Sequence, residues 1–145
     1  MSQGDLQSEK YILYADDDRE DQELFIEMLK EVDAKMSLVC VSDGEHAIEF
    51  LENLEPGATF PCLVLLDMNM PKLNGIETLK KIKNNSYYHV LHVILFSTAI
   101  KDNDIDIVLS LGAVDYVKKP MKYTEFENVV RRFIDHCEVV PQRER

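Results

Sequence analysis

The sequence predicts an α/β protein in which helices cover both faces of a doubly wound, parallel sheet of five strands. Short apolar runs rich in β-branched and aromatic residues alternate five times with longer amphipathic segments. The runs at 62–67 and 92–97 are almost wholly apolar, which is typical of strands buried on both faces. The chain has 145 residues, 46% of them hydrophobic, which is enough for one domain with a full core.

Each strand is predicted from a short apolar run, and most of these runs lead into polar residues. In chain order the strands are YILYA (11–15), MSLVCVSD (36–43), CLVLLD (62–67), HVILFS (92–97) and AVDYVKK (113–119). Pro56, Gly57 and Pro61 mark the loop before the third strand.

Each helix is predicted from apolar side chains spaced three and four residues apart. The helices are expected at 19–33, 44–55, 75–84, 101–112 and 122–137. Gly112 ends the fourth of them, since glycine is favoured just after the last helical residue. Regular alternation of strand and helix implies right-handed crossovers within one domain at 10–137. Residues 1–9 and 138–145 are predicted to be tails.

Composition excludes several classes of function. The formal net charge of −11 argues against a nucleic-acid binder and against an anionic membrane surface. No apolar run approaches the roughly 20 residues of a membrane span, and the polar N-terminus lacks the apolar core of a signal peptide. We therefore expect a cytoplasmic protein.

The three cysteines are odd in number and far apart, and none forms a CxxC pair. We expect Cys40, Cys62 and Cys137 to be small buried side chains, unpaired in a reducing compartment.

Three consecutive acids, Asp16, Asp17 and Asp18, follow the first strand, and Asp67 ends the third. The carboxyl ends of parallel strands form one edge of the sheet, where α/β proteins bind their ligands. Like charges this close repel by roughly 1 to 4 kcal/mol per pair, so a counter-charge is needed. Carboxylates with few other ligands suit Mg²⁺, which is the cofactor that we expect.

A hydroxyl and an ammonium group belong to the same edge, because Ser97 ends the fourth strand and Lys119 ends the fifth. Phosphoryl transfer requires mainly positioning and neutralisation of charge, and a carboxylate can serve as its nucleophile. The five glycines are too scattered to form a phosphate-binding loop. The pattern therefore indicates phosphoryl handling at a carboxylate without a bound nucleotide.

The chain resembles the receiver domain of bacterial two-component response regulators, of CheY-like size, from about residue 10 to residue 137. "LLDMNMPKLNG" fits the family pattern D-x-x-M-P-x-x-x-G around the phosphoacceptor position. The matching positions, in order and in register, are the acidic pair Asp16-Asp17, the acceptor Asp67, the hydroxyl Ser97, the aromatic switch Tyr116 and the lysine Lys119. The resemblance implies the flavodoxin-like strand order 2-1-3-4-5.

The resemblance also implies roles at the metal. Asp17 and Asp67 would bind Mg²⁺ directly, together with the backbone carbonyl of Asn69, and Asp16 would act largely through a bound water. Asp18 has two interpretations, an N-cap of the first helix or a further ligand, and we favour the cap.

The remaining roles concern the phosphoryl group. Asp67 would accept it from a sensor histidine kinase, while Lys119 and Ser97 would bind its oxygens. Ser97 would then move and let Tyr116 turn inward. The peptide bond between Lys119 and Pro120 is expected to be cis. Thr98 leaves a register shift by one residue open, although the spacing to the lysine favours Ser97.

These features predict a stand-alone receiver that signals by protein contact and is not a turnover enzyme. The long loop before the third strand suggests the subgroup paired with phytochrome-type or hybrid kinases. The downstream partner is unknown, and a homodimer is left open. The alternative is a pseudo-receiver, a binding module that is never phosphorylated; its usual signature, a lost aspartate or lysine, is absent. A dehalogenase-type phosphatase is disfavoured because Asn69 stands where its second aspartate belongs.

Overall fold

The sheet has five parallel strands in the order β2-β1-β3-β4-β5, as predicted. The structure is a computed structural model and describes residues 10–98 and 101–137. The strands are β1 (Tyr11–Ala15), β2 (Ser37–Val41), β3 (Leu63–Leu66), β4 (Val93–Ser97) and β5 (Asp115–Lys118). The helices are α2 (Arg19–Val32), α3 (Gly44–Glu52), α4 (Gly75–Lys83), α5 (Asp102–Ser110) and α6 (Tyr123–His136). The doubly wound fold class is therefore confirmed.

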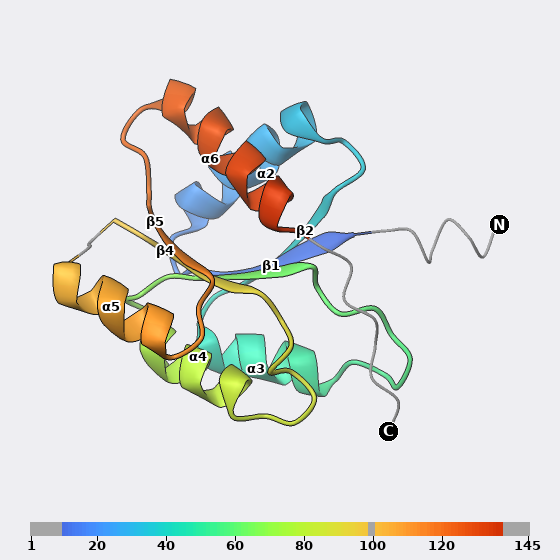
Figure 1. Cartoon of the computed structure of the whole chain (residues 1–145). Coiled ribbons are helices and arrows are strands. Elements are labelled where there is room, and N and C mark those ends of the chain that lie inside the picture. Colours follow the sequence, from blue (N-terminus) through green and yellow to red (C-terminus); the bar gives the residue numbers. More distant parts are fainter. Residues whose placement is uncertain (1–9, 99–100, 138–145) are drawn as a thin grey trace, which may run out of the picture.

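The helices form two layers, with α2 and α6 on one face of the sheet and α3, α4 and α5 on the other (Figure 1). Each layer of helices covers an apolar core on its own face of the sheet. Phe25, Phe126 and Phe133 pack against one face, with the rings of Phe25 and Phe133 stacked at 5.9 Å between centroids. Leu51, Leu79 and other aliphatic side chains fill the opposite face. The strands β3 and β4 are fully buried, which explains their almost wholly apolar sequences.

Each element is one to three residues shorter than predicted, except β1, which matches. The second helix ends at Glu52 instead of residue 55, with Asn53 as its C-terminal cap. Apolar periodicity continues to Leu54, which packs against the core from outside the helix. The spacing of apolar side chains indicates which residues are buried, whereas the capping residue marks where the hydrogen bonding of the helix backbone ends.

Side chains cap the helices that start near the carboxyl ends of β1, β2 and β3. The carboxylate of Asp18 accepts hydrogen bonds from the backbone N–H groups of Glu20 and Asp21, so the predicted N-cap of α2 is confirmed. Asp43 caps α3, and Asn74 with Glu77 forms a capping box on α4. Gly112, just after α5, has a φ of 108°, which explains why glycine stands there.

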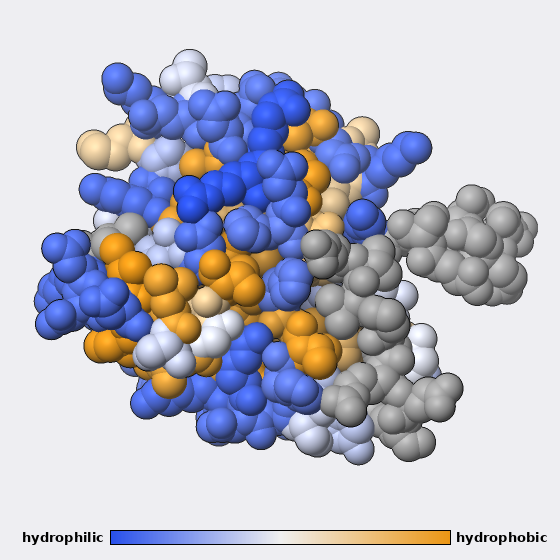
Figure 2. All heavy atoms as spheres, in the orientation of Figure 1, coloured by the Kyte–Doolittle hydropathy of each residue, from blue (hydrophilic) through white to orange (hydrophobic). Residues whose placement is uncertain are grey.

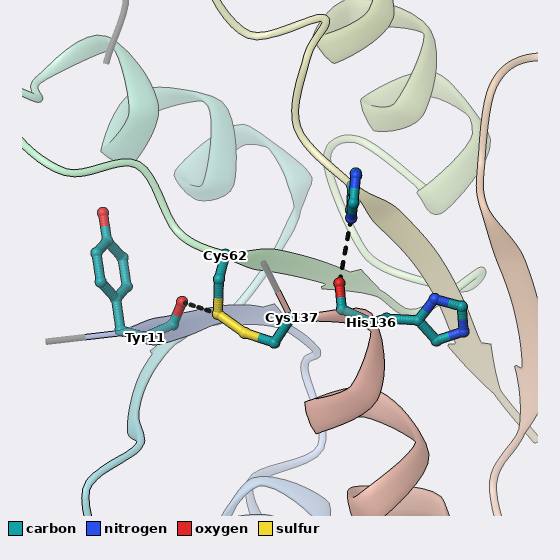
Figure 3. Close-up of a disulfide and its surroundings, with 5 residues drawn as sticks. Tyr11, Cys62, His136 and Cys137 are labelled. Atoms are coloured by element: carbon teal, nitrogen blue, oxygen red, sulfur yellow. Dashed lines mark hydrogen bonds between the residues drawn. A yellow bond between two sulfur atoms is a disulfide. The ribbon is translucent and has the colours of Figure 1, made fainter. Parts of the chain in front are cut away.

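The prediction of unpaired cysteines is wrong for two of the three. Cys62, just before β3, and Cys137, just after α6, form a disulfide with their Cα atoms 4.8 Å apart (Figure 3). They are separated by 75 residues in sequence, so only the packing of α6 against the sheet brings them together. Nearby, Nδ1 of His92 lies 3.1 Å from the carbonyl oxygen of His136. Cys40 is free and half-buried.

Within 10–98 and 101–137, no helix is both long enough and apolar enough to cross a bilayer. The predicted tails, 1–9 and 138–145, lie outside the described residues.

Candidate functional site

The carboxyl ends of four strands bring the predicted site residues together. Asp16 follows β1, Asp67 follows β3, Ser97 ends β4 and Lys119 follows β5. Backbone hydrogen bonds extend the sheet pairing to these positions, from Asp67 N–H to the Ala15 carbonyl and from Lys119 N–H to the Ser97 carbonyl. The sheet order thus places β3, with Asp67, at the centre of the group.

Asp67 is buried and is surrounded by hydrogen-bond donors. The hydroxyl of Ser97 donates to Oδ1 of Asp67 at 2.7 Å, and the backbone N–H of Asn69 lies 3.4 Å from the same oxygen. Nζ of Lys119 lies 3.6 Å from Oδ2. Burial raises the pKa of Asp67 above its ordinary value, although the hydrogen bond from Ser97 and the charge of Lys119 oppose the shift. One carboxylate oxygen thus contacts a hydroxyl while the other faces an ammonium group.

Three carboxylates form a cluster at this edge. Ligand oxygens of Asp16, Asp17 and Asp67 all lie within 4.8 Å of one another, with Asp17 exposed and the other two buried. The donor set consists of hard oxygen atoms and is open to solvent on the side of Asp17, which fits Mg²⁺ with part of its water shell retained. The role predicted for the carbonyl of Asn69 stays a prediction.

Both carboxylate oxygens of Asp16 accept hydrogen bonds from groups that the motifs did not include. The hydroxyl of Tyr14 donates to Oδ2 of Asp16 at 2.6 Å, and the backbone N–H of Asp18 donates to Oδ1 at 2.9 Å. No sequence motif included Tyr14. Its position two residues before Asp16 was the available signal, because residues i and i+2 of a strand point to the same side.

Lys119 contacts three carboxylates. Its Nζ lies 2.5 Å from Oδ2 of Asp16, 2.7 Å from Oδ2 of Asp21 and 3.6 Å from Oδ2 of Asp67. Burial lowers the pKa of Lys119, but the hydrogen bonds with Asp16 and Asp21 outweigh it and leave the pKa above its ordinary value. Asp21 was missed by sequence analysis, since an acid in the first turn of a helix is common for reasons of capping and dipole alone.

The expectation of a cis bond between Lys119 and Pro120 is wrong, because the described residues contain no cis peptide bond. The trans form is the preferred isomer of X-Pro bonds, by roughly 0.5 to 1 kcal/mol. Lys119 reaches the acidic cluster with this bond trans.

Tyr116 lies inward, 8% exposed, within the core beneath α5. Burial raises its pKa to about 12, with smaller contributions from Asp104 and Asp67, while a hydrogen bond to the side chain of Ser97 opposes the shift. Ser97 is therefore in contact with both the acceptor and the aromatic position. Thr98 is exposed, so the geometry places Ser97 and not Thr98 against Asp67.

Gly75 allows α4 to begin directly against the acceptor segment. A Cβ atom at this position would stand 2.5 Å from the backbone oxygen of Asp67 and 3.0 Å from Cα of Met68. Both are backbone atoms, so an added methyl group would displace the chain at Asp67 itself.

Gly75→Ala is therefore expected to destabilise the fold by about 1 to 3 kcal/mol, the range for overpacking. We also expect the variant to bind Mg²⁺ more weakly. Urea unfolding and calorimetric Mg²⁺ titration measure the two effects. Wild-type stability and Mg²⁺ affinity in Gly75→Ala would contradict the close approach. Lys81→Ala, at an exposed position of the same helix, is the control.

Comparison with known proteins agrees with this geometry. The family model of the response regulator receiver domain matches residues 12–131. The transcriptional regulatory protein CrdR of Helicobacter pylori is 33% identical over 127 residues, which is 84% of this chain and 56% of CrdR. CpxR of Escherichia coli is 35% identical over 123 residues, 85% of this chain and 48% of CpxR. The chain thus spans about half the length of these curated relatives.

Two solved structures resemble the chain over most of its length. The phosphorylated cyanobacterial phytochrome response regulator RcpA has a TM-score of 0.80 and 28% identity, covering 90% of this chain and 94% of RcpA. The Mn²⁺-bound form of the response regulator Rcp1 has a TM-score of 0.78 and 28% identity, covering 92% and 99%. Sequence motifs, sheet order and both kinds of comparison agree that the chain belongs to the family of response regulator receiver domains.

Proposed function

We propose that this chain is the phosphoacceptor of a two-component phosphorelay and takes a phosphoryl group from a sensor histidine kinase onto Asp67. The observation that carries the proposal is the set of contacts around this one carboxylate. Ser97 lies 2.7 Å from one oxygen, Lys119 lies 3.6 Å from the other, and two further acids lie beside it. A nucleophile, two groups for phosphoryl oxygens and a set of metal ligands are thus in contact.

The proposed reaction is a transfer between two protein side chains. An oxygen of Asp67 forms a bond to phosphorus as the bond between phosphorus and the kinase histidine nitrogen breaks, and the product is an acyl phosphate. The ammonium group of Lys119 and the hydroxyl of Ser97 bind phosphoryl oxygens and offset their charge. Mg²⁺, held by Asp16, Asp17, Asp67 and the carbonyl of Asn69, would supply further charge neutralisation when bound. In this proposal the chain promotes its own phosphorylation and dephosphorylation and is not a turnover enzyme on a separate substrate.

The finer proposal is a stand-alone, cytoplasmic regulator whose kinase is of the phytochrome type or a hybrid. The similarity to RcpA over 94% of the RcpA chain supports it. Output would then occur by protein contact, including contact with a second copy. Ile107, Leu109 and Val114, on α5 and before β5, are each more than 40% exposed, and Figure 2 shows apolar atoms gathered over α5. Sedimentation velocity with and without beryllofluoride tests the homodimer.

The intact mass of the wild-type chain, measured after incubation with acetyl phosphate, tests the central proposal. We expect the addition of one phosphoryl group in the presence of Mg²⁺ and none after chelation. A chain that gains no phosphoryl group and binds no beryllofluoride would be a pseudo-receiver, which contradicts the proposal. Steady hydrolysis of p-nitrophenyl phosphate would contradict it in a different way, by indicating a phosphatase.

A further inference from the structure

Lys119 is held by an acid on α2 as well as by the acids of the strands. Oδ2 of Asp21 lies 2.7 Å from Nζ of Lys119, whereas the nearer oxygen of the acceptor, Asp67, lies 3.6 Å away. Asp16 completes the set at 2.5 Å. The ammonium group therefore binds the carboxylates that follow β1 and that belong to α2 more closely than it binds the carboxylate of Asp67.

The first turn of α2 fixes Asp21 in this place. Asp18 caps the helix and accepts a hydrogen bond from the backbone N–H of Asp21. Asp21 is the third helical residue, and its side chain is one-third exposed while that of Lys119 is 8% exposed. A charge-assisted hydrogen bond to a partly screened carboxylate is strong enough to hold an ammonium group and weak enough to exchange.

We propose that Asp21 is a positioning residue that holds Lys119 in a resting position on the α2 side of the site. The inference rests on the proposed function, because it concerns the approach of Lys119 to a phosphoryl group on Asp67. To bind an oxygen of that group, the ammonium must loosen its contact with Asp21. Asp21 therefore slows phosphorylation of the chain and restrains the lysine when no phosphoryl group is present.

Asp21→Asn tests the inference, because asparagine keeps the size of the side chain and removes its charge. We expect the rate constant of phosphorylation by acetyl phosphate at saturating Mg²⁺ to rise by about three- to tenfold, the range for loss of one partly screened ion pair. The matched control is Glu20→Gln, which removes the same charge from an exposed residue on the same turn. Its rate constant is expected to stay within about twofold of wild type.

A thermodynamic cycle shows whether Asp21 acts through the lysine. In the background of Lys119→Met, the change Asp21→Asn is expected to leave the residual rate constant unchanged. A general electrostatic effect on the anionic donor would persist in that background. Urea unfolding of each variant controls for damage to the fold.

A second readout needs neither Mg²⁺ nor a phosphoryl donor. The ammonium protons of Lys119, which is buried and held by two carboxylates, are expected to give a slowly exchanging signal in ¹H–¹⁵N spectra of the metal-free protein. Lys119→Met assigns the signal by its loss. Glu20→Gln should retain it, whereas Asp21→Asn should shift it or broaden it away.

Equal rate constants for Asp21→Asn and Glu20→Gln, a slower Asp21→Asn, or an unchanged ammonium signal would each overturn the role of Asp21 while leaving the proposed function intact. The same holds for an effect that persists in the Lys119→Met background. A wild-type chain that takes up no phosphoryl group would instead remove the proposed function, and this inference with it.

Discussion

Asp67→Asn is expected to abolish phosphoryl uptake, with a loss of at least about 100-fold in the rate constant, because an amide oxygen is not a competent nucleophile here. Intact mass after treatment with acetyl phosphate and Mg²⁺ measures this directly. The matched control is Asp106→Asn on the exposed side of α5, which should be phosphorylated like the wild type.

The same variant is expected to fold at least as stably as the wild type. Burial raises the pKa of Asp67 in the folded chain, so the ionised carboxylate destabilises the fold at neutral pH relative to its protonated form. Asparagine removes that charge. Phosphoryl uptake by a stably folded Asp67→Asn variant would place the acceptor on a different residue and contradict the assignment.

Reduction of the disulfide between Cys62 and Cys137 is expected to lower the free energy of unfolding by about 4 kcal/mol. The bond closes a loop across a sequence separation of 75 residues, and the loss of freedom in the unfolded chain grows with the length of such a loop. For a domain of this size, the melting temperature should fall by roughly 10 °C or more. Thermal unfolding of the wild type with and without a reducing agent measures the difference, with free thiols counted in parallel.

The effect should be confined to stability. The disulfide lies at the amino end of β3, whereas Asp67 lies at the carboxyl end, so the reduced chain should still accept a phosphoryl group. Cys40→Ala should respond to the reducing agent like the wild type, and Cys62→Ala/Cys137→Ala should not respond at all. Equal melting temperatures of the oxidised and reduced wild type would contradict the prediction.

Sequence patterns were sufficient for the fold class and for the residues at the strand ends. Five strands and five helices were predicted in the correct order, because burial on both faces of a sheet and on one face of a helix imposes different periods on apolar residues. The acidic pair, Asp67, Ser97 and Lys119 were placed at one edge of the sheet for a related reason. Parallel strands share one carboxyl edge, so residues distant in sequence can be assigned to one site from their places in their own strands.

Other features depended on contacts between elements that periodicity does not describe. Apolar spacing continued past Glu52 to Leu54, but the cap at Asn53 ends the helix. The pairing of Cys62 with Cys137 follows from where α6 ends against the sheet, and nothing local to either cysteine indicates it.

The sequence by itself determined which chemical groups this protein brings to one edge of its sheet. The tertiary structure alone decided which of those groups contact one another. A long lysine side chain can reach several carboxylates, and their distances and burial determine which of them it binds. Lys119 lies closest to Asp16 and Asp21, and Asp21 came from the first turn of α2, where no motif pointed to it. Which charged groups pair in a buried site depends on differences of about 1 Å in the distances between them. Only the packing of helix against strand sets distances on that scale.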